Sequence, residues 1–246
     1  MFSLKGRSAL VTGGSRGLGL VMASALVRQG AEVWINSRDP IALTAAAESI
    51  GARPLPFDVV DGQAARDALA VIAKAHGSLD ILINNAGIQL RKPLTDWEDD
   101  EFDRVIATNL SSCFRLSRDA AKLMLPRGFG RIINTGSISA ILGRATIHAY
   151  VAAKAGLHGM TRSMAAELGK SGITVNAIAP GYFATELNQA LLKDEAFSKW
   201  VASQTPLGRW ARPEEIGGAA VYLASNEASF VNGHILVVDG GLSTAL

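Results

Sequence analysis

Short apolar runs alternate with helical patterns along this chain, and the alternation limits the folds open to it more than any other feature. Short apolar runs bounded by turn residues are typical of buried strands. Helical periodicity fills several of the segments between the runs, for example residues 64–75 and 149–168. Strands that alternate with helices are typical of α/β proteins, so we predict an α/β fold. The runs occupy residues 8–12, 32–37, 53–57, 79–83, 131–135, 172–178 and 235–238.

Composition fits one domain that spans residues 1–246. Of the 246 residues, 48% are hydrophobic and 19% are charged, and no internal repeat or low-complexity linker divides them. The net charge is +2 without a basic block, which argues against a nucleic-acid partner. The single cysteine allows no internal disulfide, and the four histidines form no metal-spaced cluster. No apolar run is long enough for a membrane span and the first residues lack a signal-peptide core, so we expect a cytoplasmic protein.

The first apolar run leads into a glycine-rich turn, Gly13-x-x-x-Gly17-x-Gly19, which opens a helical pattern that reaches Arg28. Strand, glycine-rich turn and helix in this order form the context that a dinucleotide fingerprint requires. Glycine lets the backbone approach a diphosphate closely, and the helix N-terminus supplies free N–H groups and a positive dipole. The spacing differs from the commoner Gly-x-Gly-x-x-Gly, and a plain tight turn is the alternative interpretation.

The end of the second run indicates which dinucleotide binds. In NAD-binding proteins an acidic residue near the end of this strand accepts a hydrogen bond from the ribose 2′-hydroxyl. Here Ser37 and Arg38 stand at that place, and Arg16 in the glycine-rich turn adds a second cation. Serine and arginine suit a 2′-phosphate through charge-assisted hydrogen bonds, so we predict NADP, with NAD as the alternative cofactor. A solvated surface arginine is the other interpretation of Arg38.

Tyr150 and Lys154 are four residues apart in the helical pattern of residues 149–168, so they lie one turn apart on the same face. A cation beside a phenol favours the phenolate, which makes the phenol a better acid/base near neutral pH. Ser137 could hold the reacting oxygen if the fold brings it near. A surface pair on an amphipathic helix is the alternative for Tyr150 and Lys154.

Three further stretches follow or interrupt these elements. Residues 84–87, Asn-Asn-Ala-Gly, suit either a plain turn or a strand end that faces a ligand crevice. Asn109 interrupts a long helical pattern over residues 98–125, where it could be an exposed polar residue or could bend the helix towards the site. Residues 182–212 have weak periodicity after a strand end, which is where we expect a substrate lid.

Taken in this order, the motifs resemble those of the short-chain dehydrogenase/reductase family over nearly the whole chain. The resemblance implies a single-domain Rossmann fold, with a doubly wound parallel sheet of seven strands in the order 3-2-1-4-5-6-7 and helices on both faces. It also implies an NAD(P)-dependent oxidoreductase that interconverts a secondary alcohol and a ketone, assembled as a homotetramer or a homodimer. The matching residues are Thr12-Gly13-x-x-x-Gly17-x-Gly19, residues 84–87, Asn109, Ser137, Tyr150-x-x-x-Lys154 and Pro180-Gly181.

The resemblance also assigns a role to each matching position. Tyr150 would act as acid/base on the substrate oxygen, and Lys154 would bind the nicotinamide ribose. Ser137 would hydrogen-bond the substrate oxygen, and Asn109 would anchor a water in the proton relay. The other residues implied to bind the cofactor are Gly13, Ser15, Arg16, Gly17, Leu18, Gly19, Ser37, Arg38, Asp58, Val59, Asn85, Ala86, Gly87, Pro180, Gly181, Phe183 and Thr185.

A closer resemblance is to gluconate 5-dehydrogenases. Residues 84–93 and 181–189 are similar to loops of those enzymes, which implies gluconate and 5-ketogluconate as the substrate pair. Substrate contacts would then come from Ser137 and Tyr150 together with polar residues outside the shared motifs. These candidates are Gln89, Arg91 and Arg144, with Lys92 and His148 as further cations, and each of the cations could instead be a plain surface charge.

Two alternatives to this function stay open at the level of the sequence. Reductases of 3-oxoacyl-[acyl-carrier-protein] and other carbonyl reductases share these stretches loosely, so one of them is the alternative enzyme. A non-catalytic nucleotide-binding regulator is a remote alternative, because such proteins usually lack one of the four catalytic positions and all four are present here.

Overall fold

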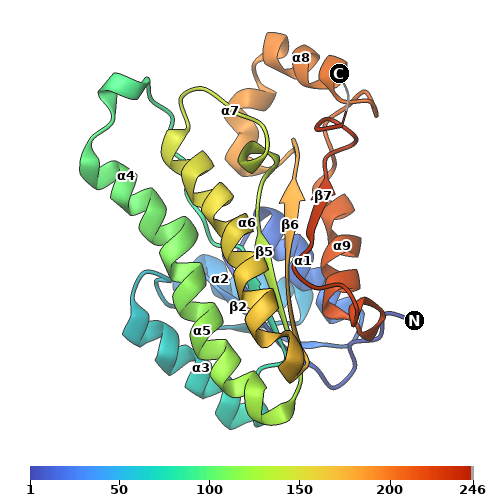
Figure 1. Cartoon of the computed structure of the whole chain (residues 1–246). Helices are drawn as coiled ribbons and strands as arrows, with labels where there is room; N and C mark the ends of the chain where they lie inside the picture. Colours follow the sequence, from blue (N-terminus) through green and yellow to red (C-terminus); the bar gives the residue numbers. More distant parts are fainter. Residues whose placement is uncertain (245–246) are drawn as a thin grey trace.

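Residues 1–244, which the computed structural model describes, contain seven parallel strands in one sheet with the order β3-β2-β1-β4-β5-β6-β7 (Figure 1). This order confirms the predicted Rossmann topology. Because the strands are parallel, their carboxyl ends meet at one edge of the sheet, which lies at the top of Figure 1 beneath α7 and α8. The strands are β1 (Ser8–Thr12), β2 (Glu32–Asn36), β3 (Arg53–Pro54), β4 (Ile81–Asn84), β5 (Gly130–Thr135), β6 (Ile173–Pro180) and β7 (Ile235–Val238).

Helices cover both faces of the sheet and form two hydrophobic cores. The first core lies between the sheet and α1, α2 and α9, and it includes the buried Leu26 and Leu223. The second lies between the sheet and α3, α5 and α6, and it includes Ile72 and Leu116. The α-helices of the described chain are α1 (Gly17–Arg28), α2 (Pro40–Ile50), α3 (Gly62–His76), α4 (Asp99–Ile106), α5 (Ser112–Met124), α6 (His148–Leu168), α7 (Gln189–Leu192), α8 (Glu195–Gln204) and α9 (Gly217–Ala224).

The strands contribute to both cores because successive side chains point to opposite faces of a sheet. On β1, Val11 packs in the first core and Leu10 in the second, and on β4 the same holds for Ile83 and Leu82. All four side chains are fully buried. Each contributes roughly 1.5–3 kcal/mol relative to an exposed position. The apolar runs are therefore continuous rather than alternating, as expected of strands that are covered on both faces.

The third strand is shorter than predicted. The sequence predicts a strand over residues 53–57, but only Arg53–Pro54 is regular strand. Pro54 and Pro56 have no N–H group to donate to a neighbouring strand, which confines such a segment to the edge of a sheet. Leu55 still donates its N–H to the Ile35 carbonyl at 2.9 Å, so the chain follows β2 to the edge of the cleft described below.

The helix predicted over residues 98–125 is divided by a π-helical turn. Its parts are α4, the π-turn at Ala107–Ser111 and α5. Asn109 lies in the turn and bonds to the backbone of Ile88, so a contact with a distant loop replaces regular helix here. Single π-turns inside α-helices are frequent at functional sites.

Residues 182–212 include α7 and α8, which lie above the carboxyl edge of the sheet (Figure 1). Four aromatic side chains of this segment, Tyr182, Phe197, Trp200 and Trp210, pack with ring centroids between 5.3 and 6.3 Å apart. This aromatic cluster gives the predicted lid region a small core of its own. None of the helices between residues 1 and 244 is long and apolar enough to span a membrane.

Candidate active site

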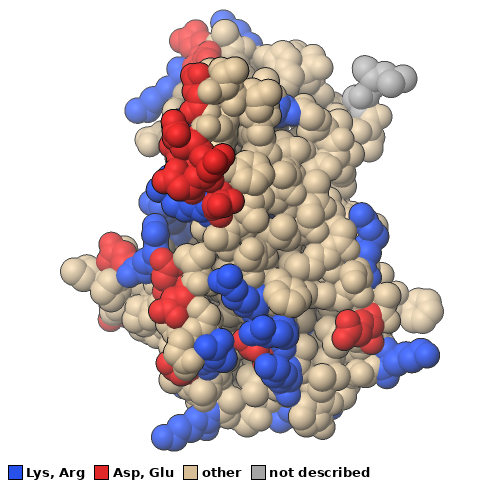
Figure 2. Space-filling view, turned by 60° about the vertical axis from the view of Figure 1, so that its left-hand side comes forward, with Lys and Arg blue, Asp and Glu red and all other residues tan. Residues whose placement is uncertain are grey.

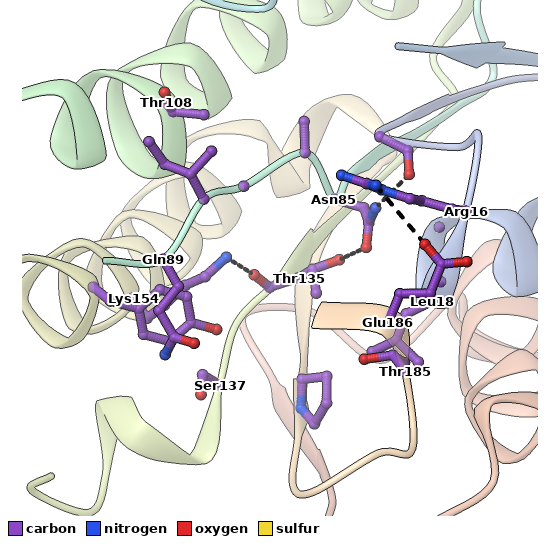
Figure 3. A pocket seen from close by; sticks show the side chains of 18 of the residues that line it. Arg16, Leu18, Asn85, Gln89, Thr108, Thr135, Ser137, Lys154, Thr185 and Glu186 are labelled. Atoms are coloured by element: carbon purple, nitrogen blue, oxygen red, sulfur yellow. Dashed lines mark hydrogen bonds and ion pairs between the residues drawn. The ribbon is translucent and has the colours of Figure 1, made fainter. Parts of the chain in front are cut away.

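One cleft of about 730 Å³ runs along the carboxyl edge of the sheet, from the glycine-rich turn to the lid region (Figure 3). Apart from Lys92 and His148, every residue that the sequence predicts to bind cofactor or substrate lines this cleft. Of the four predicted catalytic residues, Ser137, Tyr150 and Lys154 also line it, whereas Asn109 does not. Strands β1, β2, β4, β5 and β6 all deliver residues to the cleft at their ends, as the parallel topology requires.

The glycine-rich turn has no room for side chains at Gly13 and Gly19. A Cβ atom on Gly19 would lie 2.2 Å from the Gly13 carbonyl oxygen, and one on Gly13 would lie 2.9 Å from Cα of Ala86. Gly13 also has a φ of 63°, which favours glycine. Arg16 at the N-cap of α1 makes no capping hydrogen bond through its side chain, so the first N–H groups of α1 are left for a ligand. This cradle fits the diphosphate of a dinucleotide.

The loop after β4 is fixed to the glycine-rich turn. The Asn85 side chain donates from Nδ2 to the carbonyl oxygens of Thr12 at 3.0 Å and Gly13 at 3.1 Å. In return, the Thr12 hydroxyl accepts hydrogen bonds from the backbone N–H groups of Asn85 and Ala86 at 3.0 and 3.1 Å. The glycine-rich turn and the loop after β4 are therefore held together as one unit.

The end of the cleft next to β2 is cationic and open to solvent. Arg38 is 75% exposed and its Nη1 lies 4.0 Å from a carboxylate oxygen of Asp58. Arg16 is 77% exposed and pairs at 3.8 Å with Glu186 of the lid region, across the cleft (Figure 3). Exposed pairs of this kind are weak. Both guanidinium groups are therefore available to a phosphate that binds at this end.

Lys154 is held in place beneath the cleft. Its side chain is on α6, is only 4% exposed, and donates from Nζ to the Thr135 carbonyl oxygen at 2.6 Å (Figure 3). Nζ lies 5.6 Å from the ring centroid of Tyr150, one helical turn earlier. The helix thus places an ammonium group beside a phenol, as the spacing of four residues predicts.

Ser137 follows β5 in extended backbone and faces the same part of the cleft. It is 7% exposed, and its Oγ accepts a hydrogen bond from the Ser139 N–H at 3.0 Å. A hydroxyl that accepts one hydrogen bond keeps its own proton as a donor. The Ser137 hydroxyl is therefore oriented and still able to donate to an oxygen in the cleft.

Asn109 acts on the cleft indirectly. It is fully buried, its Oδ1 accepts from the Ile88 N–H and its Nδ2 donates to the Ile88 carbonyl, both at 2.8 Å. A Cβ on Gly87 would lie 3.2 Å from the same Oδ1, so this loop is tightly packed on the π-turn. The side chain of Asn109 thus fixes the loop that lines the cleft, and its predicted role as a water anchor stays a prediction.

Two arginines meet at the end of the cleft near Tyr150. Arg144 donates to the Tyr182 hydroxyl, and its guanidinium lies 4.8 Å from the centroid of the Phe197 ring. Arg91 donates from Nη2 to Gln89 Oε1 at 3.0 Å. Burial lowers the pKa of Arg91, and the positive charge of Arg144 lowers it further, which reflects how close the two cations lie. Two neighbouring cations in a partly buried site favour an anionic group between them.

The other cations proposed for the substrate lie elsewhere. Lys92 points away from the cleft and pairs with Glu101 at 2.6 Å. His148 packs edge-on against Trp97 with 6.5 Å between ring centroids. Their role as surface charges or structural groups, which the sequence left as an alternative, is the one that these contacts support.

Sequence reasoning missed two residues that line the cleft from α4 and the π-turn, Arg104 and Thr108. The sequence offered one signal for them. Thr108 directly precedes the predicted Asn109, and Arg104 lies four residues earlier, on the same helical face as Thr108. Sequence reasoning also did not single out Tyr182, which lies two residues after the end of β6 and carries the hydroxyl that Arg144 contacts. Residues 1–244 hold no group of three or more His, Cys, Asp or Glu placed to bind a metal.

Known proteins share this fold over the full chain. A family model described as enoyl-(acyl carrier protein) reductase matches residues 13–243. A gluconate 5-dehydrogenase of Gluconobacter oxydans (strain 621H) is 45% identical over 251 residues, which cover 100% of this chain and 98% of the relative. A 3-oxoacyl-[acyl-carrier-protein] reductase of Salmonella typhimurium (strain LT2) is 40% identical over 242 residues, with 98% of each chain covered. The crystal structure of a gluconate 5-dehydrogenase from Burkholderia cenocepacia J2315 in complex with NADP and tartrate is 43% identical, with a TM-score of 0.95 and coverage of 100% of this chain and 98% of that one.

A parallel Rossmann sheet with a dinucleotide cradle at one end of its cleft and a tyrosine–lysine pair at the other defines a nicotinamide-dependent oxidoreductase. With the family match over most of the chain, the assignment is specific: the chain belongs to the short-chain dehydrogenase/reductase family. It is an NAD(P)-dependent oxidoreductase that acts on CH–OH groups.

Proposed function

We propose that this chain interconverts D-gluconate and 5-keto-D-gluconate with NADP as its cofactor. The observation that carries the proposal is the pair of guanidinium groups, Arg91 and Arg144, at the end of the cleft that also holds Tyr150 and Ser137. A sugar acid needs a cation for its carboxylate and polar partners for its hydroxyls, and Gln89 is such a partner. Relatives named for gluconate 5-dehydrogenation, at 45% and 43% identity, support the same substrate.

In the proposed reaction the chain moves a proton at the substrate oxygen. Tyr150 takes the proton of the hydroxyl during oxidation and returns it during reduction. Ser137 donates a hydrogen bond from its hydroxyl to the same oxygen and so fixes the position of that oxygen. Lys154, anchored on the Thr135 carbonyl, keeps a positive charge beside the phenol and has N–H groups left for ribose hydroxyls. The bound nicotinamide supplies the hydride acceptor or donor.

The proposed cofactor is NADP, with NAD as a weaker alternative. Ser37, Arg38 and Arg16 surround the place where the 2′-phosphate would lie, and the two arginines are mostly exposed and only weakly paired. The predicted cofactor residues from Gly13 to Thr185 line one continuous cleft, which supports a shared role. A structural relative described with bound NADP supports this choice over NAD.

The alternative function is reduction of a 3-oxoacyl thioester. The aromatic cluster of the lid region borders the substrate end through Tyr182, and an acyl chain could pack against such apolar rings. The 3-oxoacyl-[acyl-carrier-protein] reductase that is 40% identical to this chain also supports this alternative. The two neighbouring guanidinium groups at the substrate end disfavour it, because an uncharged acyl chain offers them no anion.

A substrate panel tests the proposal. The purified protein would be offered gluconate, other sugar acids, polyols and acetoacetyl thioesters with NADP or NAD, and turnover followed at the nicotinamide absorbance band. We expect oxidation of gluconate with NADP. Arg91→Met should raise KM for gluconate by about 10-fold or more and leave KM for NADP unchanged, since one charge-assisted contact is worth about 1.5–3 kcal/mol.

Lys92→Met is the matched control, because Lys92 is the next residue and pairs with Glu101 outside the cleft. It should leave KM for gluconate unchanged. Reduction of acetoacetyl thioesters without detectable gluconate oxidation would decide for the acyl reductase.

We also propose that residues 1–246 form one domain and that the protein assembles in the cytoplasm as a homotetramer or a homodimer. Phe102 on α4 and Phe114 on α5 are 39% and 46% exposed, and exposed aromatic side chains on neighbouring helices favour contact with a second copy. Figure 2 shows this side of the molecule, where acidic side chains gather in the upper part and a broad area carries few charges. Sedimentation velocity measures the assembly directly.

A further inference from the structure

Helix α6 meets the end of β5 in a seam that has a hydrogen bond on each side of its middle. On one side, Lys154 donates from Nζ to the Thr135 carbonyl at 2.6 Å. On the other, the Asn134 side chain donates from Nδ2 to Thr161 Oγ1 at 2.9 Å. These bonds hold the helix that carries the tyrosine–lysine pair against the strand that leads to the catalytic serine. Between Lys154 and Thr161 on α6 lies His158, which contributes by packing.

His158 occupies the middle of the seam. It is 5% exposed, and its Nε2 has no hydrogen-bond partner among the described residues. A Cβ atom on Gly136 would lie 2.2 Å from His158 Nε2 and 2.9 Å from its Cδ2. The imidazole therefore fills the space that the absent side chain of Gly136 leaves. Burial and then the charges of Lys154 and Arg162 lower the pKa of His158 to about 4, so the ring is neutral at neutral pH.

Gly136 joins two groups of the proposed mechanism. It follows Thr135, whose carbonyl holds Lys154, and precedes Ser137, whose hydroxyl faces the substrate oxygen. Its own N–H donates to the Ile178 carbonyl at 2.7 Å, which ties it to the end of β6. A shift of Gly136 would therefore move the serine relative to the lysine. The imidazole of His158 packs directly behind it.

We propose that His158 is a positioning residue: by its packing on Gly136, it sets the distance between the Ser137 hydroxyl and the Tyr150–Lys154 pair. His158 does not line the cleft, so it acts on the substrate only through these neighbours. The inference rests on the proposed function, because it takes Ser137, Tyr150 and Lys154 as the groups that act on the substrate oxygen. It predicts an energetic coupling between His158 and Gly136 that appears in kcat.

Gly136→Ala is the direct test, because the added methyl group meets the imidazole and otherwise comes no closer than 3.3 Å, to the Ile178 carbonyl. We expect kcat to fall by about 10- to 100-fold, as expected when a catalytic group is displaced by about 1 Å. The affinity for NADPH, measured by fluorescence titration, should stay unchanged. His158→Ala makes room for the methyl group, so the double variant Gly136→Ala/His158→Ala should recover most of the kcat that Gly136→Ala loses.

Unchanged kcat in Gly136→Ala, or a loss that His158→Ala does not repair, would overturn the inference. If Gly136→Ala alone fails to fold and the double variant folds, the contact is supported, because the clash of the methyl group with the imidazole is then what prevents folding. If both fail to fold, His158→Ala decides: lower kcat at unchanged NADPH affinity supports positioning, and wild-type kcat overturns it.

The substrate panel keeps this inference separate from the proposed function. If the wild-type protein does not act on gluconate, the gluconate proposal fails, and the variants are compared on whichever alcohol or ketone the wild type converts. If it does act on gluconate but the double variant shows no recovery, only the positioning role of His158 fails.

Discussion

The buried ammonium of Lys154 shows how single residues define this site. A buried charge is stable only with a hydrogen-bond partner, and the Thr135 carbonyl at 2.6 Å provides one. The same contact fixes Nζ 5.6 Å from the Tyr150 ring centroid. The lysine is therefore a rigid part of the cleft floor, beside the Tyr150 phenol that we propose exchanges a proton with the substrate.

Tyr150→Phe should abolish turnover and spare cofactor binding. The change removes only the hydroxyl, whose proton is used in the chemical step, so the loss should fall on kcat by about 100-fold or more. NADPH affinity from fluorescence titration should match the wild type. Tyr222→Phe is the control, because Tyr222 packs on Phe2 away from the cleft. A Tyr150→Phe variant that keeps a tenth of the activity would require another acid.

Preference for NADP should depend on Ser37 and Arg38. Replacing Ser37 with Asp and Arg38 with Leu removes a cation and adds an acid where the 2′-phosphate would lie, which should lower kcat/KM with NADP by about 10-fold or more, because a charge-assisted contact is worth about 1.5–3 kcal/mol. Activity with NAD should rise or stay level. Arg53→Leu is the control, since Arg53 pairs with Glu32 outside the cleft. Equal kcat/KM for both cofactors in the unmodified protein would contradict the prediction.

At the scale of elements, the sequence predicted the existence and order of the strands better than their limits. Continuous apolar runs indicate strands covered on both faces, and each of the seven predicted runs overlaps a strand of the sheet. The division of the helix over residues 98–125 could not be read from local periodicity, because it depends on the bond between Asn109 and Ile88, which are distant in sequence. The same limit applies to Tyr182 and Arg144, whose contact forms only when the lid region folds over the cleft.

The lid region is joined to the glycine-rich turn by the pair of Arg16 and Glu186, and this contact should compete with the cofactor. Glu186→Gln frees Arg16 for a phosphate and removes a negative charge from the cleft, so NADP should bind more tightly. An exposed pair is worth at most about 1 kcal/mol, so the gain should be at most about 5-fold and should shrink at high salt. Isothermal titration with NADP measures it. Glu195→Gln breaks a comparably exposed pair with Lys199 on α8 and should change nothing; weaker binding in Glu186→Gln would contradict the prediction.

At the scale of the whole molecule, stability in acid depends on two kinds of group, carboxylates with a lowered pKa and buried histidines. Asp119 is paired with Arg118 and Lys122, and hydrogen bonding to Arg118 lowers its pKa to about 2. A carboxylate with a lowered pKa stabilises the fold above its unfolded pKa of 3.8, and that contribution is lost as pH falls towards 2. The contribution of Asp119 to stability therefore changes with pH only below about pH 4. A loss of stability that begins near pH 6.5 requires a group that titrates there in the unfolded chain and has a lowered pKa in the folded protein, such as a buried histidine.

His158 is such a group, and it should make the protein lose stability as pH falls from about 6.5 to 4. Burial lowers its pKa to about 4 in the folded state, whereas an unfolded histidine titrates near 6.5. Between these two pH values His158 binds a proton in the unfolded chain but stays neutral in the folded protein, so the free energy of unfolding should fall by up to about 3 kcal/mol. Urea unfolding at pH 7 and pH 4.5 measures the difference. His158→Gln should flatten the pH dependence, whereas His234→Gln, at an exposed position, should keep it. An equally steep pH dependence in His158→Gln would assign the acid sensitivity to another group.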